Sequence, residues 1–96
     1  MMEQAFGIYL TNDPGITSPN AVKSRISKAR KAEGILKTSL DDVVSDDREM
    51  YEALEKLQQY ENPKSNPMQN AVRKYYKFKN DREFPRKKEY ARAKHP

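Results

Sequence analysis

Apolar residues recur along this chain at the spacing of an α-helix, and no segment shows the apolar–polar alternation that is typical of a β-strand. Prolines and other turn-forming residues interrupt the pattern, most clearly in "TNDPGITSPN" and "ENPKSNP", so each helical segment is short. Short helices gain most of their stability by packing an apolar side against a neighbour. The sequence therefore predicts an all-α fold, a small bundle of four to five short helices.

The second helix has the clearest signals for both of its ends. Ser18 is a capping residue, and Pro19 follows it in the first turn, where a proline costs no helical hydrogen bond. Gly34 stands where a glycine often ends a helix, so we expect this helix to end near Glu33. The other expected helices cover residues 2–10, the "SLDDVV" segment, a stretch from residue 46 or 47 through 57, and residues 67 to about 80.

The end of the last of these helices marks the expected end of the folded domain. In "RKKEYARAKHP", near the C-terminus, Tyr90 and the alanines are almost the only apolar residues. Such a segment has little to bury against a core. We therefore expect a helical domain over residues 1–80 and a basic, flexible tail over residues 81–96, in which the last segment is either a frayed helix or disordered.

A thin core also limits what the domain can bind. Hydrophobic residues make up 35% of the 96 residues and charged residues 34%, so we expect no cofactor and no small-molecule substrate. The chain has no cysteine, and its single histidine is the penultimate residue, His95, so no metal site is expected. No apolar run could span a membrane, and Glu3 and Gln4 stand where a signal peptide has cations. These features predict a cytoplasmic protein without a membrane partner.

Charge is segregated along the chain, which is more informative than the net charge of +5. Residues 1–40 carry six Lys and Arg against three Asp and Glu, and residues 63–96 carry eleven against three. The segment between them, residues 41–62, carries two against eight. Two basic segments therefore flank an acidic one, and the folded surface is expected to separate the two signs.

In the second and last helices, the face opposite the apolar stripe contains no carboxylate. An exposed helix face normally mixes signs, because like charges one turn apart repel each other. Cations beside short polar side chains suit phosphate oxygens, so the pattern predicts duplex DNA as the partner. The candidate DNA-binding residues are Lys23, Ser24, Arg25, Ser27, Lys28 and Lys31 in the second helix and Asn70, Arg73, Lys74 and Lys77 in the last.

Two further expectations concern individual members of this set. Arg25, Arg73 and Asn70 have the planar donors that make bidentate contacts with bases, so any sequence preference is expected to come from them. Lys28 and Lys74 lie opposite the apolar stripes. Reversing either charge is therefore expected to change the stability by less than about 0.5 kcal/mol.

The three aromatic rings of "NAVRKYYKFKN" (residues 70–80) follow from the same helical spacing. Tyr75 lies on the apolar stripe and Phe78 on its edge, so both are expected to be core residues. Tyr76, also at the edge, is the one ring that we retain as a candidate contact for nucleic acid.

The order of the segments resembles a known family. "FGIYL", the Ser-led basic helix "SPNAVKSRISKA", the "SLDDVV" turn, a middle helix and "NAVRKYYKFKN" are similar to the SAM-like N-terminal, or core-binding, domain of phage integrases and other tyrosine recombinases. The resemblance covers about residues 2–80. It implies a bundle of four or five helices that clasps duplex DNA, with two helices near the major groove. Carried over by position, it points to Lys23, Ser24, Lys28, Lys31, Arg73, Lys74 and Lys77.

The catalytic domain of a recombinase would need a further segment of well over a hundred residues. No Ser-His-Asp, paired-carboxylate or glycine-loop arrangement is recognisable in the chain, so we expect no enzymatic activity. The sequence thus favours a non-catalytic DNA-binding module. A small regulatory module of phage or plasmid type that binds a host nucleic-acid enzyme is the alternative, and RNA binding ranks third because no exposed aromatic platform is evident.

Overall fold

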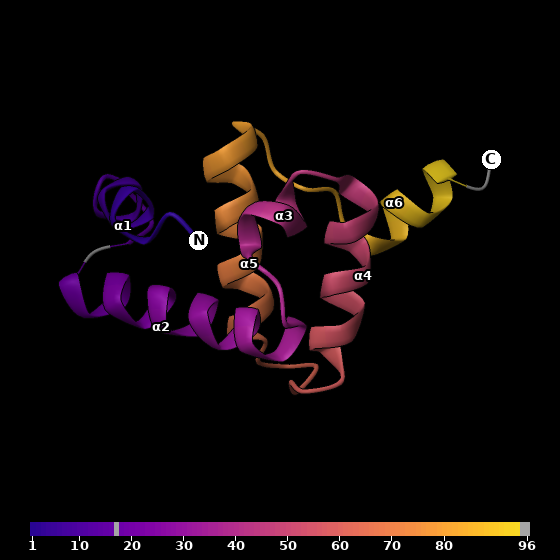
Figure 1. The fold of residues 1–96 in the computed structure, drawn as a ribbon, viewed down its shortest axis with the longest axis horizontal. Helices are drawn as coiled ribbons and strands as arrows, with labels where there is room; N and C mark the ends of the chain where they lie inside the picture. Colours follow the sequence, from indigo (N-terminus) through magenta and orange to yellow (C-terminus); the bar gives the residue numbers. More distant parts are fainter. Residues whose placement is uncertain (17, 95–96) are drawn as a thin grey trace.

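Six helices form the part of the chain that the computed structural model describes, residues 1–16 and 18–94 (Figure 1). No strand occurs in these residues, which confirms the all-α fold, with one helix more than expected. His95 lies outside the described residues. The helices are α1 (Glu3–Thr11), α2 (Pro19–Leu36), α3 (Leu40–Val44), α4 (Asp47–Gln58), α5 (Pro67–Asn80) and α6 (Lys87–Lys94).

Helix α5 is the central element of the bundle. It packs most extensively on α2 and also contacts α1, α3 and α4 (Figure 1). Its buried residues lie at helical spacing and include Val72, Tyr75 and Tyr76, all without solvent exposure. Because α5 is covered on several sides, only its remaining face can reach solvent, and that face carries the candidate site described below.

None of the helices in residues 1–16 and 18–94 combines the length and the apolar character that a membrane span requires.

The beginning of α2 agrees with the prediction from the sequence, but its end does not. Ser18 caps the first turn as expected, because its Oγ accepts a hydrogen bond from the Ala21 N–H at 3.2 Å. The expected end near Glu33 is wrong, since α2 continues through Gly34 to Leu36 and Lys37 caps it with a φ of 57°. Residues 35 and 36 pack against the core. Their burial outweighs the poor helix propensity of a single glycine.

Gly34→Ala is expected to raise the free energy of unfolding by about 0.5–1 kcal/mol. Gly34 has no positive φ, and a Cβ added there would meet no atom within 4 Å, so alanine only restricts the unfolded chain and favours the helix. Urea unfolding measures the change. Gly7→Ala is the matched control with a smaller gain, because its Cβ would lie 3.4 Å from Ile26 Cδ1. A loss of stability in the Gly34 variant would contradict helical continuation through this position.

The segment after α5 belongs to the core. Phe84 is only 4% exposed and Tyr90 only 9%, and both belong to the same apolar cluster as α5. The Phe84 ring packs edge-on against Tyr76 at 5.1 Å between centroids, and Tyr90 stacks on Tyr51 at 5.0 Å. The packed domain therefore extends beyond residue 80, where the sequence analysis placed its end. The sequence did not indicate this because two rings six residues apart form no periodic apolar pattern, although each ring buries a large apolar surface.

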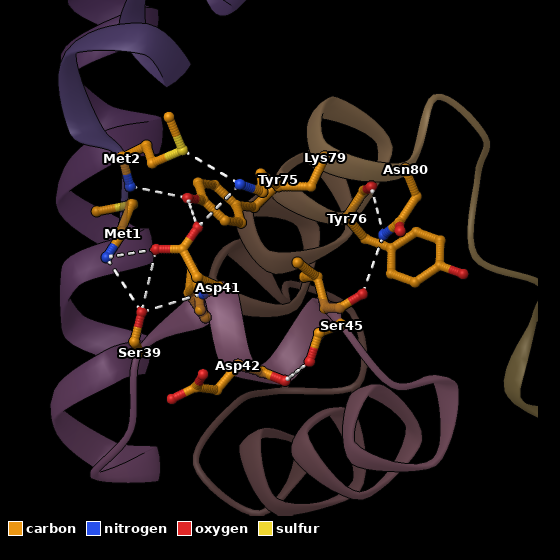
Figure 2. A network of polar contacts seen from close by, with 12 residues as sticks. Met1, Met2, Ser39, Asp41, Asp42, Ser45, Tyr75, Tyr76, Lys79 and Asn80 are labelled. Carbon is orange, nitrogen blue, oxygen red and sulfur yellow. Dashed lines mark hydrogen bonds and ion pairs between the residues drawn. The ribbon is translucent and has the colours of Figure 1, made fainter.

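Tyr75 joins α5 to α3 and to the N-terminus through its hydroxyl (Figure 2). It donates to Asp41 Oδ1 at 2.5 Å and accepts from the Met2 N–H at 2.8 Å. Asp41 also contacts the Met1 α-amino group at 3.3 Å and Lys79 Nζ at 3.5 Å. The hydroxyl of a fully buried ring thus has both a donor and an acceptor partner, as buried polar groups require.

Candidate nucleic-acid interface

A concave surface of about 400 Å³, here called the basic cleft, lies between α2, α5 and residues 83–86. Its lining contains five cationic side chains and a single carboxylate. Five residues of the predicted set meet there, although they come from two helices far apart in the sequence. The lining residues are Arg25, Asn70, Arg73, Lys74, Lys77, Glu83, Phe84 and Arg86.

Helix α5 supplies four of these side chains because they occupy one face. At 100° per residue, positions 70 and 77 lie along the middle of this face, and positions 73 and 74 lie towards its two edges. The opposite side of α5 is buried, with Met68, Val72 and Tyr76 in the core. The face assignment made from the sequence is therefore confirmed for α5.

Lys74 has its charge balanced from outside the helix. Its Nζ lies 2.5 Å from Asp13 Oδ2, and the two side chains are only 27% and 12% exposed. The turn after α1 holds the carboxylate in place, since Asp13 Oδ1 accepts from the Gly15 N–H at 2.8 Å. The hydrogen bonds from Lys74 and from Gly15 lower the pKa of Asp13, so the pair remains charged. A glutamate at position 74 would face Asp13, so we now expect reversal of this charge to cost more than the 0.5 kcal/mol expected from the sequence.

The guanidinium of Arg73 makes hydrogen bonds within the protein. It donates to the carbonyl oxygens of Phe84 at 3.0 Å and Pro85 at 3.3 Å, and it lies over the Phe84 ring. Burial lowers the pKa of Arg73. These contacts attach the segment after α5 to the helix. Because Nη1 makes both bonds, these contacts hold the guanidinium against the protein, and the role of Arg73 in contacting bases stays a prediction.

Arg25 and Arg86 are the unengaged cations of the basic cleft. Within residues 1–16 and 18–94, neither side chain has a hydrogen-bond or ion-pair partner. Lys77 is only loosely paired, with Nζ 3.8 Å from a carboxylate oxygen of Glu83, whose side chain is 81% exposed. At Arg25 and Arg86 the basic cleft therefore presents positive charge that has no acidic partner among the residues that the structure describes.

The predicted face of α2 is divided between different surfaces. Lys23 and Ser27 line a second hollow that α2 forms with α1, where Arg30 pairs with Glu3. The other members, Ser24, Lys28 and Lys31, line neither hollow. Ser24 and Lys31 are exposed and Lys28 is half-buried. The helix is wide enough to contact different neighbours on its two flanks, so one contiguous site over all six residues does not form.

Three residues that affect this site were not predicted from the sequence: Asp13, Glu83 and Arg86. All lie in connections between helices, where helical periodicity makes no prediction. The basic run "RKK" that begins at residue 86 was the only available signal, and it was assigned to the tail.

The aromatic rings of α5 belong to the core. Tyr75 and Tyr76 have no solvent exposure, and Phe78 is partly buried against the same cluster. The Tyr76 hydroxyl donates to Asp47 Oδ1 at 2.6 Å, and burial together with this bond raises its pKa to about 12. The expectation for Tyr75 and Phe78 is confirmed. The retention of Tyr76 as a candidate contact is wrong, because the ring faces α4 and Phe84.

No protein-family model matches this chain, and neither a curated protein nor a solved structure is similar to it. The resemblance to recombinase core-binding domains stays a prediction.

Proposed function

We propose that this protein is a non-catalytic module that binds duplex DNA through the basic cleft and the neighbouring cations of α2. The observation that carries the proposal is the pair of unengaged guanidinium groups, Arg25 and Arg86, in a cleft with a single carboxylate. Guanidinium groups bind phosphate oxygens through pairs of parallel hydrogen bonds. Phosphates account for most protein–DNA hydrogen bonds, and they position a protein without reading the sequence.

An extended anion fits better than a small one because the positive surface continues outside the cleft. Lys28 and Lys31 of α2 have no ion-pair partner among the described residues, and Ser24 lies exposed beside them. The acidic segment is on a different element, since Asp47, Glu49, Glu52 and Glu55 belong to α4. A polyanion would thus meet the cations of α2 and of the basic cleft on elements other than the one that carries these carboxylates.

The affinity for duplex DNA is expected to fall steeply with salt. If Lys28 and Lys31 each neutralise one phosphate and the basic cleft holds a third, log K should decrease with log salt at a slope of about −2.7. Between about 50 and 200 mM salt, this slope corresponds to a loss of affinity of roughly 40-fold. Fluorescence anisotropy with a labelled duplex measures the slope. A salt-independent affinity would refute the proposal, and cleavage of the duplex by the pure protein would refute its non-catalytic part.

Lys28→Gln and Lys56→Gln form a matched pair of variants for this measurement. Both lysines lack an ion-pair partner in the described part of the chain, but Lys56 lies on α4, next to the acidic residues. Lys28→Gln should flatten the salt slope by about one unit, and Lys56→Gln should leave it unchanged. Equal binding by both variants and the parent would instead favour an interaction with a protein.

A further inference from the structure

The two unengaged arginines line the basic cleft from different elements, because Arg25 belongs to α2 and Arg86 to the connection between α5 and α6. Successive residues of a helix point about 100° apart, so Arg73 and Lys74 lie towards different edges of the exposed α5 face. Arg73 contacts Phe84 and Pro85, whereas Lys74 contacts Asp13, in the connection that leads to α2. We call α5 the floor of the basic cleft, and we call α2 with Arg25 and the segment with Arg86 its walls.

The floor and the walls differ in what they offer a ligand. On the floor, Arg73 and Lys74 are engaged with protein acceptors, and Lys77 is loosely paired with Glu83. In the walls, each guanidinium keeps its full set of donors. The space of about 400 Å³ corresponds to roughly a dozen water molecules at about 30 Å³ each, which accommodates a phosphate group with its ester oxygens.

We propose that Arg25 and Arg86 together hold one phosphate group of a nucleic-acid backbone, and that binding is consequently independent of base sequence. This inference rests on the proposed function and specifies its chemistry. Base edges lie at the bottom of the grooves, where only a protruding element reaches them, whereas phosphates stand on the outside of the duplex and can enter a concave site. The Asn70 amide, in the same lining, serves as a further phosphate donor.

A double-mutant cycle tests whether the two arginines share one phosphate. Arg25→Gln, Arg86→Gln and the double variant are compared by anisotropy with one duplex at about 100 mM salt. Under these conditions, loss of one phosphate contact lowers the affinity for the duplex about eightfold, and loss of two independent contacts lowers it about 60-fold. We expect each single variant to bind measurably more weakly than the parent. The double variant should lose no more than about eightfold in affinity. If the double variant loses about 60-fold in affinity, or if its affinity equals that of the parent, the proposal that the two arginines share one phosphate is wrong.

Duplexes of equal length with A·T-rich, G·C-rich and mixed sequences test the second half of the inference. The parent protein is expected to bind all three within about twofold, because each mismatched base contact would otherwise cost about 1–3 kcal/mol, or at least about fivefold. A spread of tenfold or more overturns sequence independence and leaves the proposed function intact. Failure to bind any duplex refutes the proposed function itself. Thermal unfolding by circular dichroism confirms that each variant is folded, with Lys56→Gln as the control.

Discussion

Phe84→Ala is expected to lower the free energy of unfolding by about 3–4 kcal/mol, as for other large-to-small core substitutions. The side chain is 4% exposed and packs against Tyr76, Tyr90 and the guanidinium of Arg73. Its removal leaves a cavity beside the central helix and weakens the attachment of α6. For a domain of this size, each kcal/mol lowers the midpoint of thermal unfolding by about 4–8 °C, which circular dichroism measures directly.

Phe84→Leu is the control for this substitution. Leucine retains most of the buried apolar volume, so we expect a loss below about 1.5 kcal/mol. If Phe84→Ala costs less than about 1 kcal/mol, the segment after residue 80 does not contribute to the core, and the flexible tail expected from the sequence would describe the protein better. The same substitution should also weaken the proposed DNA binding, because Glu83, Phe84 and Arg86 line the basic cleft.

Tyr75→Phe is expected to cost about 2 kcal/mol, the contribution of a hydrogen bond to a charged group. The substitution keeps the buried ring but removes the donor to Asp41 and the acceptor of the Met2 N–H. Burial and the bond to Asp41 raise the pKa of Tyr75, so the hydroxyl is protonated and available as a donor at neutral pH. Urea unfolding of the parent and the variant measures the difference.

The cost of Tyr75→Phe should also depend on pH. Burial acts to raise the pKa of Asp41, but the hydrogen bond from Tyr75 and the contact with the Met1 α-amino group outweigh it, so the pKa lies below the ordinary 3.8. A lowered carboxyl pKa adds stability at pH values above 3.8, and this stability is lost as the pH falls through the lower folded value. The difference between parent and variant should therefore be constant near neutral pH and shrink below about pH 3.8.

Tyr9→Phe serves as the matched control. Tyr9 is half-buried against the same cluster, and its hydroxyl has no hydrogen bond among the described residues. We expect a change below about 0.5 kcal/mol at every pH. Equal costs for the two tyrosines would mean that the contact between Tyr75 and Asp41 contributes nothing to stability.

The ion pair of Lys74 shows why helical periodicity predicts which face of a helix is exposed but not which of its charges are unpaired. Helical spacing placed Lys74 opposite the apolar stripe of α5, and the structure confirms that it lines an outward surface. The spacing contains no information on Asp13, which lies 61 positions earlier and reaches Lys74 only through the fold. The same holds for Arg73, whose partners are carbonyl groups of a connection between helices.

The sequence alone determined the helical architecture, the N-terminal cap of α2, the exposed face of α5 and the burial of Tyr75, because each depends on neighbours within one or two helical turns. Only the tertiary structure decided where α2 ends, that Phe84 and Tyr90 complete the core, and which cations stay unpaired. These outcomes depend on contacts between distant segments, and long-range burial and ion pairing outweigh local propensities of a few tenths of a kcal/mol. The basic cleft is therefore a product of the fold, since Arg25 of α2 and Arg86 of the connection after α5 both line it beside α5.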